Sequence, residues 1–219
     1  MIRQRYRLRA SVASGLIAFV ALCANGQQVV GSCHVPFPQG LDVSINGVEP
    51  IQFGLDTGLA ASAFSIAPEQ ARMLRLPVIG RRRVPTSDKQ PKNTGAETEL
   101  VLARDLTVAG HTFHNAEGVV MPGKSTLGIR LFRKVLLTLD YPDGCLSISD
   151  GALPAPNGSD ITAYTTVPHS TFLPLRFSPS VSIQLAGNAF PALLDTGAAH
   201  ISADIIVPLE IAKRLPPVQ

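Results

Sequence analysis

Two short stretches of the chain alternate hydrophobic with polar or small residues, and each runs into the same tripeptide. Residues 51–55 read Ile-Gln-Phe-Gly-Leu and precede an Asp-Thr-Gly triplet at residues 56–58. Residues 190–194 read Phe-Pro-Ala-Leu-Leu and precede a second Asp-Thr-Gly triplet at residues 195–197. Alternation along a segment is typical of a half-buried β-strand. Each triplet is therefore predicted to follow the end of a strand.

The two triplets lie in matching surroundings, which favours an internal repeat. A Val-Ser-Ile sequence leads into each of them, at residues 43–45 and 181–183. A Leu-Pro pair follows each of them, at residues 76–77 and 215–216. Two copies of one supersecondary unit, each carrying an aspartate, predict a site with approximate two-fold symmetry.

The rest of the chain reads as short strands and turns, which places it in the all-β class. Residues 68–76 are predicted to form a short helix, because proline suits its first turn and Pro77 stops the run. The charged segment Arg81–Gly95 is predicted to be a mobile loop. Hydrophobic patterns bounded by turn residues predict further strands over 100–108, 135–141 and 145–149, with a turn at Ala109–Gly110 after the first of them.

Composition divides the chain into two unequal units. We predict a first lobe over residues 33–150, a linker rich in glycine, alanine and proline over residues 151–160, and a second lobe over residues 161–219. The first unit continues for about 90 residues beyond its aspartate, whereas 24 residues follow Asp195. The second lobe is therefore expected to be incomplete.

Residues 1–26 have the pattern of an export signal. Four arginines lie near the start, an apolar run covers residues 15–23, and small residues follow over 24–26. The run is shorter than the roughly 20 residues that cross a bilayer, so no stable membrane span is expected. We expect an exported protein, periplasmic or extracellular. An uncleaved anchor and a lipid anchor at Cys23 are the alternatives.

Removal of this signal changes the charge and the cysteine content. The whole chain has a formal net charge of +3, but residues 1–26 hold four of its 19 basic residues and none of its 16 acidic ones. The remaining balance, 15 basic against 16 acidic residues, does not favour a nucleic-acid partner. Cys33 and Cys145 remain, and in an oxidising compartment they either pair or stay independent thiols.

Paired aspartates predict a particular chemistry. Two carboxylates held close together cannot both ionise at low cost, so Asp56 and Asp195 are predicted to share one proton. The ionised member can take a proton from water while the protonated member polarises a carbonyl group. The threonines that follow can hydrogen-bond across the pair, and the glycines let backbone N–H groups approach the carboxylates. The pattern thus predicts hydrolysis without a covalent intermediate.

On these residues the chain resembles the retropepsin-like and pepsin-like aspartic proteases. Leu55–Gly58 and Leu194–Ala198 are similar to the active-site motif of that family. Thr126–Phe132 is similar to its hydrophobic-hydrophobic-Gly segment, which packs behind the motif. The resemblance implies lobes built as closed β-barrels with short helices. It also implies that a loop within Val84–Glu97 is a flap, closing over a peptide bound in extended form.

The resemblance also assigns roles to individual residues. It makes Asp56 and Asp195 the catalytic dyad, and it implies neither a cofactor nor a metal ion. Neither Leu59 nor Ala198 carries a hydroxyl group that could donate to the carboxylates. We therefore expect an activity optimum less acidic than that of pepsin-like enzymes. The supporting residues of the active-site motif are Thr57, Gly58, Thr196, Gly197 and Gly128.

The predicted function is therefore that of an aspartic-type endopeptidase acting on peptide or protein substrates. Two alternatives remain open. In one, Asp56 of two chains forms the dyad in a homodimer, since the first unit alone is about the size of a retropepsin protomer. In the other, the chain is a non-catalytic peptide-binding or scaffold protein that keeps the protease fold. The incomplete second lobe and Leu59 favour this last reading.

Overall fold

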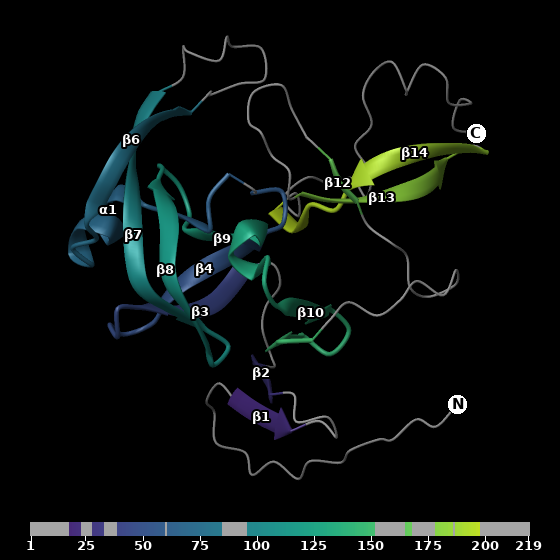
Figure 1. Ribbon diagram of the computed structural model, residues 1–219, viewed down its shortest axis with the longest axis horizontal. Coiled ribbons are helices and arrows are strands. Elements are labelled where there is room, and N and C mark those ends of the chain that lie inside the picture. The colour runs from purple at the N-terminus through teal and green to yellow at the C-terminus, as the bar shows by residue number, and fades with distance from the viewer. Residues whose placement is uncertain are drawn as a thin grey trace.

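The computed structural model describes residues 18–22, 28–32, 39–59, 61–84, 96–151, 165–167, 178–185 and 187–197. These residues are mostly strand, with few helices, so the all-β class is confirmed (Figure 1). The helices are α1 (Pro68–Met73) and the 3-10 helix η1 (Ile129–Phe132). The strands are β1 (Ala18–Leu22), β2 (Gln28–Ser32), β3 (Gln39–Ile45), β4 (Ile51–Asp56), β5 (Phe64–Ile66), β6 (Val78–Val84), β7 (Ala96–Val108), β8 (His111–Val120), β9 (Thr126–Gly128), β10 (Leu136–Asp140), β11 (Cys145–Ser149), β12 (Thr165–Val167), β13 (Ser178–Leu185) and β14 (Asn188–Leu193).

Six strands of the first lobe close into a barrel, at the left of Figure 1. Their order is β3-β4-β9-β5-β8-β7, and pairing between β7 and β3 completes the ring. The β4–β9 and β5–β8 pairs are parallel. With 13 residues, β7 is long enough to pair with β3 at one end and with β6 at the other, so β6 extends the sheet beyond the ring.

Hydrophobic side chains from the barrel strands fill its interior. Phe53 of β4 and Phe64 of β5 are almost fully buried, and their rings meet edge to face with centroids 6.4 Å apart. The Phe64 ring needs Gly118 of β8, because a Cβ there would lie 2.3 Å from ring carbons. This packing fixes the path of β4, which leads to the first triplet. The other fully buried large side chains include Leu41, Val43, Ile45, Leu55, Ile66, Val101, Leu106 and Leu127.

Several elements expected from the sequence are confirmed. The helix over 68–76 forms, although its α-helical part ends at Met73. Ala109 and Gly110 both have positive φ, 50° and 82°, as the tight turn between β7 and β8 requires. The strand predicted over 145–149 has the bounds of β11.

One local prediction is wrong, because residues 81–84 form strand and not the start of a mobile loop. They end β6, and their pairing with β7 runs as far as Val84 opposite Ala96. The arginines fit an edge strand, because long side chains pack along the sheet while their charged ends reach water. Arg81 also lies opposite Glu99, with 3.7 Å between guanidinium nitrogen and carboxylate oxygen. Residues 85–95 lie outside the described residues.

Two smaller sheets accompany the barrel. One has the strand order β1-β2-β11-β10, and the other, β12-β13-β14, lies at the right of Figure 1. Cys145 is disulfide-bonded. The register of β2 and β11 sets Ser32 opposite Leu146, which brings the residue before Cys33 next to the residue after Cys145. Cys33 lies outside the described residues, so its pairing with Cys145 stays a prediction.

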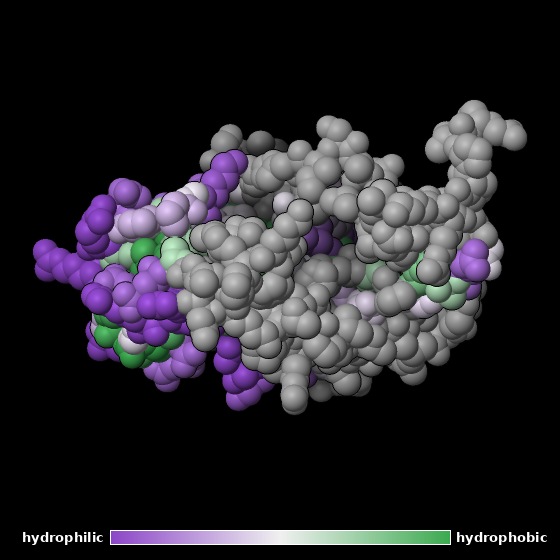
Figure 2. All heavy atoms as spheres, turned by 90° about the horizontal axis from the view of Figure 1, so that it is seen from above, coloured by the Kyte–Doolittle hydropathy of each residue, from purple (hydrophilic) through white to green (hydrophobic). Residues whose placement is uncertain are grey.

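Some predicted segments are described only in part or not at all. Within the predicted export signal, β1 pairs antiparallel with β2. The predicted linker after Gly151 lies outside the described residues, as does everything after Gly197. No helix among the described residues is long and apolar enough to cross a membrane. The described barrel surface facing the viewer in Figure 2 is mainly hydrophilic, with a smaller hydrophobic area.

Candidate active site

The two Asp-Thr-Gly triplets follow equivalent hairpins. β3 and β4 pair antiparallel, and β4 ends at Asp56. β13 and β14 pair antiparallel in the same way, and β14 ends two residues before Asp195. The sequence repeat is therefore repeated in the structure as a hairpin, and each hairpin delivers one carboxylate.

Reciprocal hydrogen bonds join the two triplets. The Thr57 amide donates to Thr196 Oγ1 over 3.1 Å, and the Thr196 amide donates to Thr57 Oγ1 over 3.0 Å. Each hydroxyl in turn donates to a carbonyl of the other lobe. Thr57 Oγ1 donates to Leu194 O at 2.5 Å, and Thr196 Oγ1 to Leu55 O at 2.8 Å. The predicted bridging by the threonines is thus present, and it has the expected two-fold pattern.

The glycines bring backbone donors to the carboxylates. Asp56 Oδ1 accepts the Gly58 amide at 2.8 Å and the Leu59 amide at 3.0 Å, and Asp195 Oδ1 accepts the Gly197 amide at 2.9 Å. Each glycine also lies against the carboxylate of the other lobe. A Cβ on Gly197 would be 2.5 Å from Asp56 Cγ, and a Cβ on Gly58 would be 2.9 Å from Asp195 Cγ. Only glycine leaves room for the two acids to meet.

The carboxyl group of Asp56 is perturbed by this arrangement. Burial, the negative charge of Asp195 and a side-chain hydrogen bond with Asp195 raise the pKa of Asp56 from 3.8 to about 6. The amides of Leu59 and Gly58 act in the opposite direction, because they stabilise the ionised form. Asp56 is half-buried whereas Asp195 is exposed, so the shared proton is held best on Asp56.

Gly128 supports the first triplet from behind. β9 runs parallel to β4 and sets Gly128 opposite Asp56. The Gly128 amide donates to Ala63 O at 2.8 Å, which ties β9 to the segment that follows the triplet. The Leu59 carbonyl accepts the Ile129 amide at 3.1 Å. Gly128 therefore lies beside the strand that ends at Asp56 and is bonded to the segment that follows the triplet.

Of the predicted flap, the structure describes only the base. β6 and β7 form the antiparallel arms on either side of residues 85–95, and those residues lie outside the described part of the chain. Ala198 also lies outside it. Among the described residues no group of histidine, cysteine, aspartate and glutamate side chains is arranged to hold a metal ion.

Two contributors to this site were missed in the sequence. The Leu59 amide is a second donor to Asp56, although sequence reasoning treated Leu59 only as a departure from the motif. Arg130, two residues after Gly128, donates from Nη1 to Ala61 O at 3.2 Å, in the loop that follows the triplet. A backbone donor is not encoded by the side chain at its position. The Arg130 contact joins segments 69 residues apart, and no local pattern signals it.

A closed β-barrel that presents one of two hydrogen-bonded Asp-Thr-Gly turns defines an aspartic-protease-like protein. Comparison with known proteins agrees, because residues 41–141 match the family model of aspartyl proteases. This segment, a little under half of the chain, is what the protein shares with the aspartyl protease family. The matched segment contains Asp56 and Gly128 and ends before Asp195.

One solved structure similar to this chain is a retropepsin-like aspartic protease from Rickettsia conorii. The sequence identity is 22%, the TM-score is 0.39, and the match covers 62% of this chain and 90% of that chain. No curated protein matches the chain.

Proposed function

We propose that this protein is an aspartic-type endopeptidase that hydrolyses peptide bonds with a water activated between Asp56 and Asp195. The observation that carries the proposal is the meeting of the two carboxylates, each with a backbone amide on one oxygen and the other lobe's glycine against it. Structural support alone does not require a half-buried acid with a raised pKa, whereas proton transfer near neutral pH does.

The proposed reaction divides the work between the two acids. Protonated Asp56 donates to the carbonyl oxygen of the scissile peptide while the carboxylate of Asp195 takes a proton from the attacking water. A tetrahedral diol results, with one new carbon–oxygen bond. Return of the Asp195 proton to the amide nitrogen breaks the carbon–nitrogen bond, and the diol proton returns to Asp56. The pair thus regains its starting state, and no covalent enzyme intermediate is formed.

The substrate is proposed to be a peptide in extended form. β6 and β7 are paired out to the base of residues 85–95, so that segment is carried on a two-stranded arm as a closing flap requires. An extended peptide presents its backbone N–H and C=O groups to such an arm. No cofactor takes part in this proposal, because the shared proton and the water suffice for the hydrolysis.

The pH dependence of cleavage tests the proposal. We expect the purified protein to cleave a denatured protein substrate, with inhibition by pepstatin. The kcat/KM profile should lose its activity on the alkaline side with a midpoint near the Asp56 pKa of about 6, because the shared proton is lost there. A profile that peaks near pH 2 would contradict the raised pKa. Peptide binding without any cleavage would favour the non-catalytic scaffold.

Export is part of the same proposal. Residues 1–26 act as a cleaved signal, and the disulfide at Cys145 supports an oxidising compartment. Cleavage removes β1 and leaves β2 at the edge of its sheet. Terminal sequencing of the protein from periplasmic or extracellular fractions should find a start near residue 27, and its mass should show one disulfide between Cys33 and Cys145. Intact Met1 on a protein confined to the cytoplasm would contradict export.

A further inference from the structure

Arg82 on β6 is a basic residue that the proposed chemistry does not use. Its Nε atom is buried and has no hydrogen-bond partner within the described part of the chain. Burial and the charge of Arg130 lower the pKa of Arg82 below its ordinary value. An unpaired guanidinium donor beside a second positive charge destabilises the fold, so such an arrangement calls for an anion.

The neighbours of Arg82 along the sheet do not supply that anion. Side chains alternate between the two faces of a strand, so Arg82 points away from the face on which Arg81 contacts Glu99. The residue opposite Arg82 is Thr98, whose hydroxyl donates to the Val120 carbonyl. On the face of the sheet where Arg82 lies, β7 therefore offers it no acidic partner.

Arg130 brings the second positive charge from beside the active site. It lies two residues beyond Gly128, which is opposite Asp56, and its Nη1 reaches the carbonyl of Ala61. That hydrogen bond satisfies one of the five N–H donors of the guanidinium, and no ion pair of Arg130 is found among the described residues. Arg130 thus acts through its charge on Arg82 of the flap-bearing arm, while its hydrogen bond joins it to the loop that follows the first triplet.

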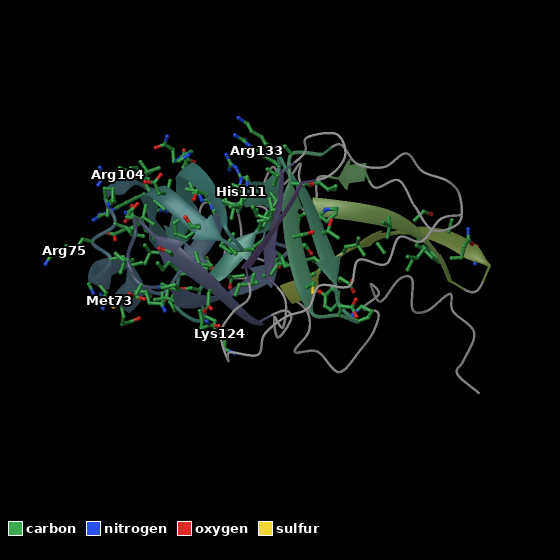
Figure 3. All side chains as sticks on the ribbon, turned by 90° about the horizontal axis from the view of Figure 1, so that it is seen from below. Met73, Arg75, Arg104, His111, Lys124 and Arg133 are labelled. Carbon is green, nitrogen blue, oxygen red and sulfur yellow. The ribbon has the colours of Figure 1, made fainter. Side chains whose placement is uncertain are left out.

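The surroundings of Arg130 are also basic. Arg130 lines a cavity of about 410 Å³ between β8 and η1. Figure 3 shows His111 and Arg133, two residues of this cavity lining, close to each other on the same side of the barrel. Lys134 adds a further positive charge, and Glu117 is the single carboxylate of the lining. The local excess of positive charge favours an acidic ligand over a basic one.

The geometry points to Arg82 and Arg130 as a subsite that binds an acidic side chain, glutamate or aspartate, of the peptide substrate. This inference rests on the proposed endopeptidase function and names a substrate preference for it. A carboxylate is the fitting ligand because guanidinium groups bind it through two parallel hydrogen bonds. Its single negative charge offsets one of the two positive charges, and it gives the buried Nε donor of Arg82 a partner.

The test compares paired peptides that differ by Glu or Gln at one position along the substrate. Wild-type protein should cleave the peptide with Glu at the preferred position with a kcat/KM at least about 10-fold above that of its Gln counterpart. Arg82→Met should reduce that ratio to about 1 while the Gln peptide is cleaved at nearly the wild-type rate. Arg130→Met should also reduce the ratio to about 1, but because Arg130 donates to Ala61 O in the loop after the first triplet, its basal rate is expected to fall as well. Arg81→Met, on the opposite face of the same strand, is the matched control and should keep the wild-type ratio.

Binding separates this inference from the proposed function. Labelled Glu and Gln peptides are titrated into the inactive Asp56→Asn protein, and the Glu peptide should bind about 10-fold more tightly. If the Glu and Gln peptides are cleaved at equal rates at every position, the acidic subsite is overturned and the proposed endopeptidase function stands. Selective binding of the Glu peptide with no cleavage by the wild type supports the subsite and overturns the endopeptidase. If the preference for the Glu peptide survives in Arg82→Met, other residues are responsible for it, and the role of Arg82 is overturned.

Discussion

Replacing Asp56 by asparagine is expected to lower kcat for peptide hydrolysis by at least about 1000-fold and to make the folded protein more stable at neutral pH. The activity is lost because asparagine has no proton to give to the substrate carbonyl. The stability rises because the folded protein holds the Asp56 pKa at about 6, above its ordinary value of 3.8. The folded state binds more protons between these values, so wild-type stability falls as the pH rises through them.

Asparagine does not ionise, so it removes the loss of stability that ionisation of Asp56 causes, and it keeps the local contacts. Its Oδ1 can still accept the amides of Gly58 and Leu59, and its NH₂ group can donate to Asp195. After allowance for solvent screening of a half-exposed group, we expect a gain of about 1 kcal/mol at pH 7 and none below pH 3.8. Thermal unfolding of the variant and of the wild type, at pH 7 and below pH 3.8, measures this difference in stability. Asp150→Asn, at an exposed aspartate, should change neither stability nor activity.

The companion variant Asp195→Asn separates a single-chain dyad from a dimeric one. In the described structure Asp195 is the partner of Asp56, so Asp195→Asn should be as inactive as Asp56→Asn. If Asp195→Asn keeps wild-type activity while Asp56→Asn has none, the dyad forms from Asp56 of two chains. Equal activity of Asp56→Asn and wild type contradicts the proposed reaction itself.

Local patterns were sufficient to predict the parts of this fold that are set by neighbouring residues. Alternation over residues 51–55 marked β4, and the two triplets marked the ends of the hairpins. The Ala109–Gly110 turn was visible because a tight hairpin needs two residues with positive φ. The meeting of Asp56 with Asp195 was inferred from the repeat, since no local signal connects residues 139 apart.

The failures of prediction have a common physical cause. Residues 81–84 resemble a solvated loop in composition, and their pairing with β7 depends on contacts far along the chain. The effect of the Arg130 charge on Arg82 acts between β6 and η1, two elements that no local sequence pattern connects. The unequal environments of the two aspartates depend on burial, which identical triplets cannot encode. What the sequence leaves open is thus long-range packing, and that packing sets the electrostatics of the site.

Gly128→Ala is expected to destabilise the protein by about 2–3 kcal/mol and to abolish most of its activity. The added Cβ would lie 2.3 Å from Leu59 O and 2.6 Å from Ser62 O, both backbone atoms. The backbone at Gly128 has φ −94° and ψ 155°, which any residue adopts, so the cost is steric and not torsional. Relief requires the loop over residues 59–62 to move away from β9.

Such a movement also disturbs the site, because the Leu59 amide that donates to Asp56 belongs to the displaced loop. Thermal unfolding should therefore show a fall in Tm of about 5–10 °C, and kcat should fall even at temperatures where the variant is folded. Gly80→Ala is the matched control, since its Cβ would meet only Leu100 Cδ1 at 3.8 Å, an ordinary contact. Normal activity and stability in Gly128→Ala would show that β9 does not hold the first triplet in place.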